Sequence, residues 1–277
     1  MSRENERIER FYLGEMPLIK KLVEQMGWKE IFSRHLKAHG NERVPPVDAL
    51  MMLLYNITGG RQPLYELGEW VWRLDPKVYG YQSRWKRDSI NDDRFGRALD
   101  KLYWADRATM MTEIVVGMVK MHQLNLEQMH NDSTTVKAYG KISGTTRTGL
   151  KLTRGYSKDH RPDLKQLLYA LTVSSDGAVP VHYKTYAGNT TDDTTHIETW
   201  NTLTGIIGHP SFLYVADCKV CTDKQLSHIV SRGGHVITII PETWQETKIF
   251  KDEIKNKKKI RKIIWRRKIP GKEEPSV

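Results

Sequence analysis

The stretch Gln-Met-His-Asn-Asp-Ser-Thr-Thr-Val-Lys, residues 128–137, decides how this chain is expected to fold. Asp132 stands in its middle and is followed by serine, threonine and valine residues, several of which favour extended structure. Aspartate is depleted in strands, so something other than backbone propensity is needed to explain its position. A second apolar run, Phe-Leu-Tyr-Val-Ala at residues 212–216, ends directly before Asp217. The two aspartates therefore indicate a site formed by two neighbouring strands.

Carboxylates on adjacent strands supply the hard oxygen ligands that Mg²⁺ and Mn²⁺ prefer. The sequence thus predicts a divalent metal site at Asp132 and Asp217. A structural alternative is that Asp132 begins a turn and Asp217 caps the helix that follows it, because aspartate is a favoured N-cap residue. The order of strands and helices between the two aspartates bears on this choice.

Beyond residue 125 the pattern predicts strands and helices in a fixed order. The helices are expected at 194–207 and 222–232, and a lysine-rich helical segment follows the last strand. An Asp-Gly turn at residues 176–177 predicts a hairpin between the second and third strands. The strands are expected at residues 128–138, 167–174, 179–186, 212–216 and 235–240. This βββαβαβ order is similar to that of the ribonuclease-H-like fold, in which the first and fourth strands lie side by side.

Residues 1–125 show the apolar spacing of amphipathic helices, with no alternating strand pattern. We therefore expect an α/β protein with an all-helical N-terminal domain at 1–125, which could bind DNA. No signal in it is specific enough to assign a recognition helix. A ribonuclease-H-like mixed sheet is expected at 126–247, and a basic tail at 248–277.

The net charge of +11 on 277 residues is concentrated near the C-terminus. Residues 248–268 hold eleven lysines and arginines against two acids, which favours a polyanionic partner or a solvated segment. No apolar run is long enough to span a membrane, and the polar N-terminus is not a signal peptide, so a cytoplasmic protein is expected. Cys218 and Cys221 are interpreted as ordinary thiols, not as a zinc or redox site.

Five segments resemble the DDE transposases of bacterial insertion sequences, within the insertion-sequence-four superfamily. The helical N-terminal region also resembles the domain that precedes the nuclease core in one branch of that group. The segment from Tyr156 to Gln166 is the most specific of the five. The five segments are residues 130–135, 156–166, 188–192, 214–217 and 240–243.

The resemblance implies that Asp132 and Asp217 are the first two catalytic carboxylates. The family's third carboxylate is a glutamate on a later helix, within a Tyr, Arg, Glu, Lys pattern that follows an inserted β-rich segment. Nothing after Phe250 matches that pattern, so the sequence is interpreted as a copy that is incomplete at the C-terminus, truncated before the third carboxylate. Glu253 is the internal candidate, because it lies on the helix expected after the fifth strand.

The resemblance further implies two metal ions, Mg²⁺ or Mn²⁺, which activate water and then a 3′-hydroxyl for phosphodiester hydrolysis and strand transfer. Lys158, His160, Arg161 and Lys165 would contact DNA phosphates, the alternative being a turn held by local salt bridges. The expected partners are insertion-sequence ends and target DNA, with a homodimer as one option and no membrane. The expected function is transposition, and the alternative is a catalytically inactive DNA-binding remnant. This chain by itself is not expected to carry out strand transfer.

Overall fold

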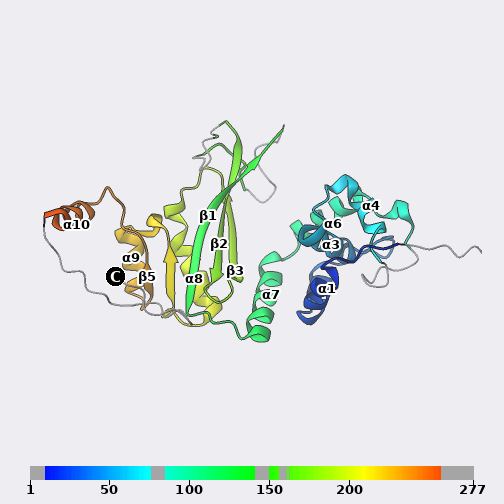
Figure 1. Cartoon of the computed structure of the whole chain (residues 1–277), viewed down its shortest axis with the longest axis horizontal. Helices are drawn as coiled ribbons and strands as arrows, with labels where there is room; N and C mark the ends of the chain where they lie inside the picture. The colour runs from blue at the N-terminus through cyan, green and yellow to red at the C-terminus, as the bar shows by residue number, and fades with distance from the viewer. Residues whose placement is uncertain (1–9, 76–84, 141–149, 156–160, 162, 257–277) are drawn as a thin grey trace, which may run out of the picture. The chain divides into compact units, whose positions relative to one another are not determined.

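The computed structural model describes residues 10–75, 85–140, 150–155, 161 and 163–256. The chain divides into two compact units (Figure 1). One unit contains Met1–Leu126 and Ser174–Val181, and the other contains Glu127–Val173 and His182–Val277. Across the part of the chain that is described, no helix has both the length and the apolar character needed to cross a bilayer.

The first unit is helical, as the sequence predicts. Helix α3 forms its centre, because its sequence Pro-Val-Asp-Ala-Leu-Met-Met-Leu-Leu-Tyr is almost entirely apolar and eight of its ten residues are buried. Side-chain caps fix where two helices begin: Asn91 accepts a hydrogen bond from the Arg94 N–H, and Asp106 accepts one from the Thr109 N–H. The helices are α1 (Met16–Gln25), α2 (Trp28–His35), α3 (Pro46–Tyr55), α4 (Leu67–Trp72), α6 (Asp92–Trp104) and α7 (Arg107–His122).

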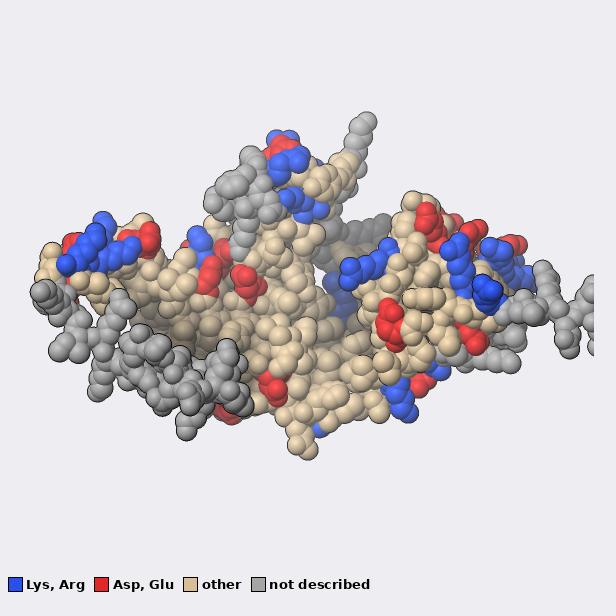
Figure 2. Space-filling view, in the orientation of Figure 1, with Lys and Arg blue, Asp and Glu red and all other residues tan. Residues whose placement is uncertain are grey.

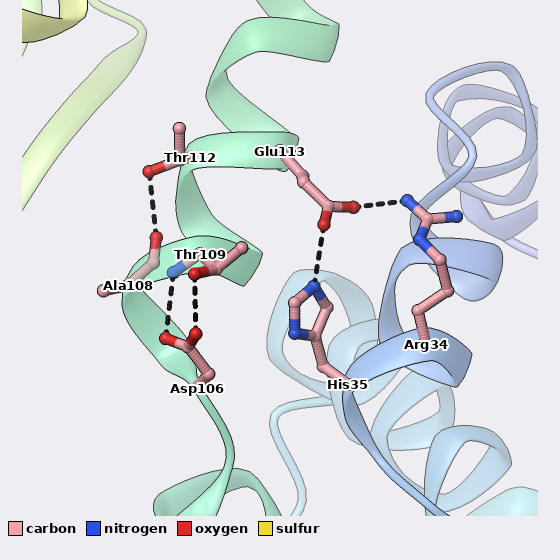
Figure 3. Close-up of polar contacts among 7 residues, drawn as sticks. All are labelled: Arg34, His35, Asp106, Ala108, Thr109, Thr112 and Glu113. Atoms are coloured by element: carbon pink, nitrogen blue, oxygen red, sulfur yellow. Dashed lines mark hydrogen bonds and ion pairs between the residues drawn. The ribbon is translucent and has the colours of Figure 1, made fainter.

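Helices α2 and α7 are joined by an apolar cluster and by one carboxylate. Ile31 of α2 packs with Met110 and Ile114 of α7. Beside this cluster, Glu113 of α7 accepts hydrogen bonds from Arg34 and His35 of α2, one on each carboxylate oxygen (Figure 3). The His35 Nε2 lies 3.0 Å from Glu113 Oε1.

We expect this carboxylate to make the stability of the helical unit depend on pH. The hydrogen bonds from Arg34 and His35 hold the pKa of Glu113 below its ordinary value of 4.5. A carboxylate with a lowered pKa stabilises the fold above its unfolded-state pKa, and that stabilisation is lost as the pH falls through the folded-state value. Glu113→Gln should remove this loss below about pH 4.5, measured as the free energy of unfolding at pH 7 and pH 3.5. The exposed Glu30→Gln is the control, and equal pH dependence in Glu113→Gln and the natural chain would contradict the prediction.

The second unit contains a five-stranded mixed sheet with the strand order β3-β2-β1-β4-β5. Strands β1 and β4 are parallel, as are β4 and β5. The strands are β1 (Gln128–Ala138), β2 (Lys165–Ser174), β3 (Pro180–Ala187), β4 (Leu213–Ala216) and β5 (His235–Ile237), and the helices are α8 (His196–Ile207), α9 (Asp223–Val230) and α10 (Gln245–Asn256). The predicted fold class is confirmed, including the adjacency of the first and fourth strands.

Two hydrogen bonds establish that β1 and β2 run antiparallel. The backbone N–H of Asn125, just before β1, donates to Asp176 Oδ2. Six residues later, Asn131 Nδ2 donates to Thr172 Oγ1 at 2.9 Å. The partner number falls as the β1 number rises, which is the pairing of antiparallel strands.

One face of the sheet carries the core of the second unit. Trp200 of α8 stacks on Phe212 with ring centroids 6.1 Å apart, and both side chains are buried. Ile229 of α9 is also fully buried, and α9 lies against β5 (Figure 1). Strand β5 is shorter than the predicted 235–240, and its pairing with β4 ends at Ile237 opposite Val215.

Candidate metal and nucleic-acid site

Asp132 and Asp217 occupy neighbouring positions on β1 and at the end of β4. The pairing of these parallel strands ends with Asn131 opposite Ala216, and the next residue of each is an aspartate. Adjacent strands lie about 4.8 Å apart. Extending the register by one residue therefore brings the two aspartate backbones to about that separation, and both side chains are exposed.

The two carboxylates share one face of the sheet. Side chains alternate between faces along a strand, and Asn131 and Ala216 are buried on the face that carries the core. Asp132 and Asp217 therefore lie on the opposite face, together with the half-buried His130 and Val215 of the preceding pair. This position keeps both carboxylates accessible to a charged ligand.

Each aspartate also has a local hydrogen bond. Asp132 Oδ1 accepts from the Ser133 N–H at 2.7 Å. Asp217 Oδ1 accepts from the Lys219 N–H at 3.0 Å and caps the 3₁₀ turn Cys218–Val220. The capping role that the sequence offered as an alternative is therefore present at Asp217. A carboxylate has two oxygens and about four acceptor positions, so capping does not prevent it from binding a metal ion.

Behind β4, a buried pair of side chains ties the strand to α8. His196, at the first turn of α8, places its Nδ1 3.0 Å from the Tyr214 hydroxyl. Burial lowers the pKa of His196 and raises the pKa of Tyr214, so both side chains stay neutral at pH 7. The negative charge of the nearby Asp217 raises the pKa of His196, but by less than burial lowers it. This neutral hydrogen bond fixes the strand three residues before Asp217.

The donor set fits one hard divalent cation. Two carboxylates of neighbouring strands supply the oxygen ligands that such ions prefer. Among the residues with described positions, no group of three or more His, Cys, Asp or Glu residues is arranged to hold a metal ion. Glu253 lies on α10, a helix with no buried residue. Cys218 and Cys221 are free thiols, and burial raises the pKa of Cys221, as expected for an unreactive thiol.

Two of the four predicted DNA-binding residues lie in described parts of the chain. Arg161 forms a two-pronged pair with Asp163, with N–O distances of 2.8 Å at both prongs. This pair lowers the pKa of Asp163 to about 2, and it is the kind of local salt bridge expected under the structural alternative. Lys165 begins β2. Lys158 and His160 lie outside the described residues.

Comparisons with known proteins find both a family model and solved structures. A model described as a domain of unknown function, DUF4277, matches residues 8–116, within the helical region. No curated protein matches the chain. The chain is similar to a piggyBac transposase in a synaptic complex with hairpin DNA, at 12% identity and a TM-score of 0.41, over 88% of this chain and 54% of that one. It therefore spans about half the length of that transposase.

Two further similar structures are complexes of the Mos1 transposase. The paired-end complex with the left transposon end is 10% identical with a TM-score of 0.27, over 79% of this chain and 73% of that one. The mariner paired-end complex with Mn is 12% identical with a TM-score of 0.26, over 86% and 84% of the two chains. Because these TM-scores are below 0.5, the functional assignment of this chain depends on its own topology and residues.

Proposed function

We propose that this chain is a metal-dependent transposase, in which Asp132 and Asp217 are the first two catalytic carboxylates. The observation that carries the proposal is the pairing of β1 with β4, because the two aspartates follow the last paired residues, Asn131 and Ala216. A strand order that brings two acids to one exposed face is suited to phosphodiester chemistry with divalent ions.

Each residue of the proposed site has a distinct task. Asp132 and Asp217 would hold Mg²⁺ or Mn²⁺ on the exposed face of the sheet. A bound ion would supply an activated nucleophile and would stabilise the leaving oxygen. Asp217 is oriented by the Lys219 N–H, and β4 is fixed by the bond between His196 and Tyr214.

Glu253 is the proposed candidate for a third carboxylate, and it would have to approach the two aspartates when DNA and metal bind, because the three form no ligand group among the described residues. It lies on α10, which follows β5 after residues 238–244. Thr238, the first of these residues, donates a hydrogen bond from its hydroxyl to the Asp217 carbonyl oxygen at 2.7 Å. The start of the connection to α10 is therefore attached next to the proposed site.

The proposed DNA contacts come from the basic residues around the start of β2. Arg161 and Lys165 would contact phosphates, together with Lys158 and His160 of the same segment. Contacts to phosphates set the position of DNA without reading its sequence. The ends of an insertion sequence and the target DNA are the proposed partners.

A second candidate function is DNA binding without catalysis. It is favoured by the lack of a three-ligand group among the described residues, because two-ion phosphodiester chemistry requires both ions to be held.

One assay separates the two functions. The protein is mixed with supercoiled plasmid and with a labelled 24-base-pair duplex, in Mn²⁺ or in EDTA. A transposase is expected to bind the duplex and to nick the plasmid only with Mn²⁺. Binding without nicking would favour the non-catalytic function, and no DNA binding at low salt would contradict both.

A further inference from the structure

Strand β1 continues well past the end of β4, the strand that Asp217 follows. Its pairing with β4 ends at Asn131, whereas β1 itself ends at Ala138. At about 3.3 Å per residue, the six residues after Asp132 extend β1 by about 20 Å. This extension of β1, together with residues 150–155, 161 and 163–166, is called the β1–β2 arm.

The arm is held together by backbone contacts between segments distant in sequence. Thr153 pairs antiparallel with Gln166 at the start of β2, through N–O contacts of 3.4 and 2.9 Å. The N–H of Gly188, just after β3, donates to the Lys151 carbonyl oxygen at 3.2 Å. The Gln166 side chain is buried and donates to the Gly188 carbonyl oxygen at 3.1 Å. These bonds give the arm a defined shape near its basic residues.

Basic side chains outnumber acidic ones on the arm. Arg154 and Arg161 are exposed, and both interact electrostatically with Asp163, the single acidic residue among the described residues of the arm. Tyr139, just after the end of β1, is 68% exposed. Figure 2 shows Lys and Arg side chains gathered over the end of the sheet where β1 and β2 extend furthest. The arm cations are Lys137, Lys151, Arg154, Arg161 and Lys165.

We propose that the arm cations bind the phosphate backbone of duplex DNA about six base pairs away from the phosphodiester bond that lies at Asp132 and Asp217. This inference rests on the proposed function and extends its phosphate contacts at Arg161 and Lys165 to Lys137, Lys151 and Arg154. The spacing follows from the 20 Å length of the extension, because each base pair of a duplex adds about 3.4 Å along its axis.

The chemistry of the arm matches a phosphate backbone better than base edges. The arm presents a strand edge with long cationic side chains, and no described helix of the arm could enter a major groove. Five cations on one arm can neutralise several phosphates of one duplex at once. We therefore expect the arm to position DNA without selecting its sequence.

The test compares two variants with the same loss of charge. The arm variant is Lys151→Gln/Arg154→Gln, and its control is Lys224→Gln/Arg232→Gln. All four side chains belong to exposed residues of the second unit. Both variants keep the full chain, including the basic segment 248–277. Affinity for a 24-base-pair duplex is measured in EDTA between 50 and 200 mM salt, after circular dichroism has shown equal helix content.

In the arm variant, the slope of log affinity against log salt should become shallower by about two. Each phosphate contact contributes about 0.9 to that slope. The control variant should change the slope by less than one. Because EDTA removes divalent ions, catalysis has no influence on this measurement.

The outcomes distinguish this inference from the proposed function. If the natural chain binds DNA and both variants change the slope equally, the arm surface is overturned while the transposase proposal stands. If the natural chain binds no DNA, both proposals fail. Equal binding of a 24-base-pair RNA duplex, lost in the same arm variant, would overturn DNA as the specific partner.

Discussion

Replacing either Asp132 or Asp217 with asparagine is expected to reduce Mn²⁺-dependent plasmid nicking by more than about a hundredfold. The amide has nearly the shape of the carboxylate but lacks its negative charge, so it is a much weaker ligand for a hard cation. Loss of an outer-shell partner alone costs ten- to a hundredfold in metal affinity or activity, and a direct ligand should cost more. The measurement is the rate of conversion of supercoiled to open-circular plasmid.

Two further variants control this prediction. Asp100→Asn removes the same charge from an exposed position in α6, and it should leave the rate unchanged. Glu253→Gln tests the third carboxylate, and a loss as large as that of Asp217→Asn would support its role. Nicking at the natural rate in Asp132→Asn or Asp217→Asn would contradict the proposed site.

Gly188→Ala is expected to destabilise the second unit by about 3 kcal/mol or more, in the upper range for overpacking. A Cβ atom at this position would lie within 3.0 Å of the carbonyl oxygens of Gln166 and Thr153. Both are backbone atoms held by the pairing of Thr153 with Gln166, so they cannot rotate away as a flexible side chain would. The measurement is the free energy of unfolding in urea.

Gly205→Ala is the matched control for this prediction. Gly205 lies in α8, and a Cβ atom there would meet nothing within 4 Å. Alanine within a helix is more stable than glycine by about 0.5–1 kcal/mol, so this variant should be slightly stabilised. If Gly188→Ala were as stable as the natural chain, the backbone of Gly188 could not lie as close to the Gln166 and Thr153 carbonyl oxygens as described.

The fold was predictable where local patterns are strong. Strand β1 has the predicted bounds, because its polar and β-branched residues alternate between a core face and an exposed face. The Asp-Gly turn predicted the β2–β3 hairpin, and the order of elements predicted the adjacency of β1 and β4. The end of β5 was not predictable, since it is set by a non-local pairing with β4 that ends at Ile237.

The arm cations show why part of the candidate site could not be predicted. Lys151 and Arg154, unlike Arg161 and Lys165, were not predicted as DNA contacts, because they are distant in sequence from Lys137 and no spacing rule connects them. They come together because Thr153 pairs with Gln166, a non-local contact that local propensity does not encode. The same holds in the helical unit for Glu113, whose partners on α2 lie about eighty residues earlier.

The most direct test of the account is the location of Mn²⁺ in crystals of this chain, measured by anomalous diffraction at the manganese edge. We expect a peak on the exposed face of the sheet, about 2.1–2.3 Å from a carboxylate oxygen of Asp132 and of Asp217. The proposed metal site would be contradicted if no peak lay between the two aspartates. It would also be contradicted if their carboxyl groups were more than about 10 Å apart, because the ions of a metal pair lie only about 3.5–4 Å apart.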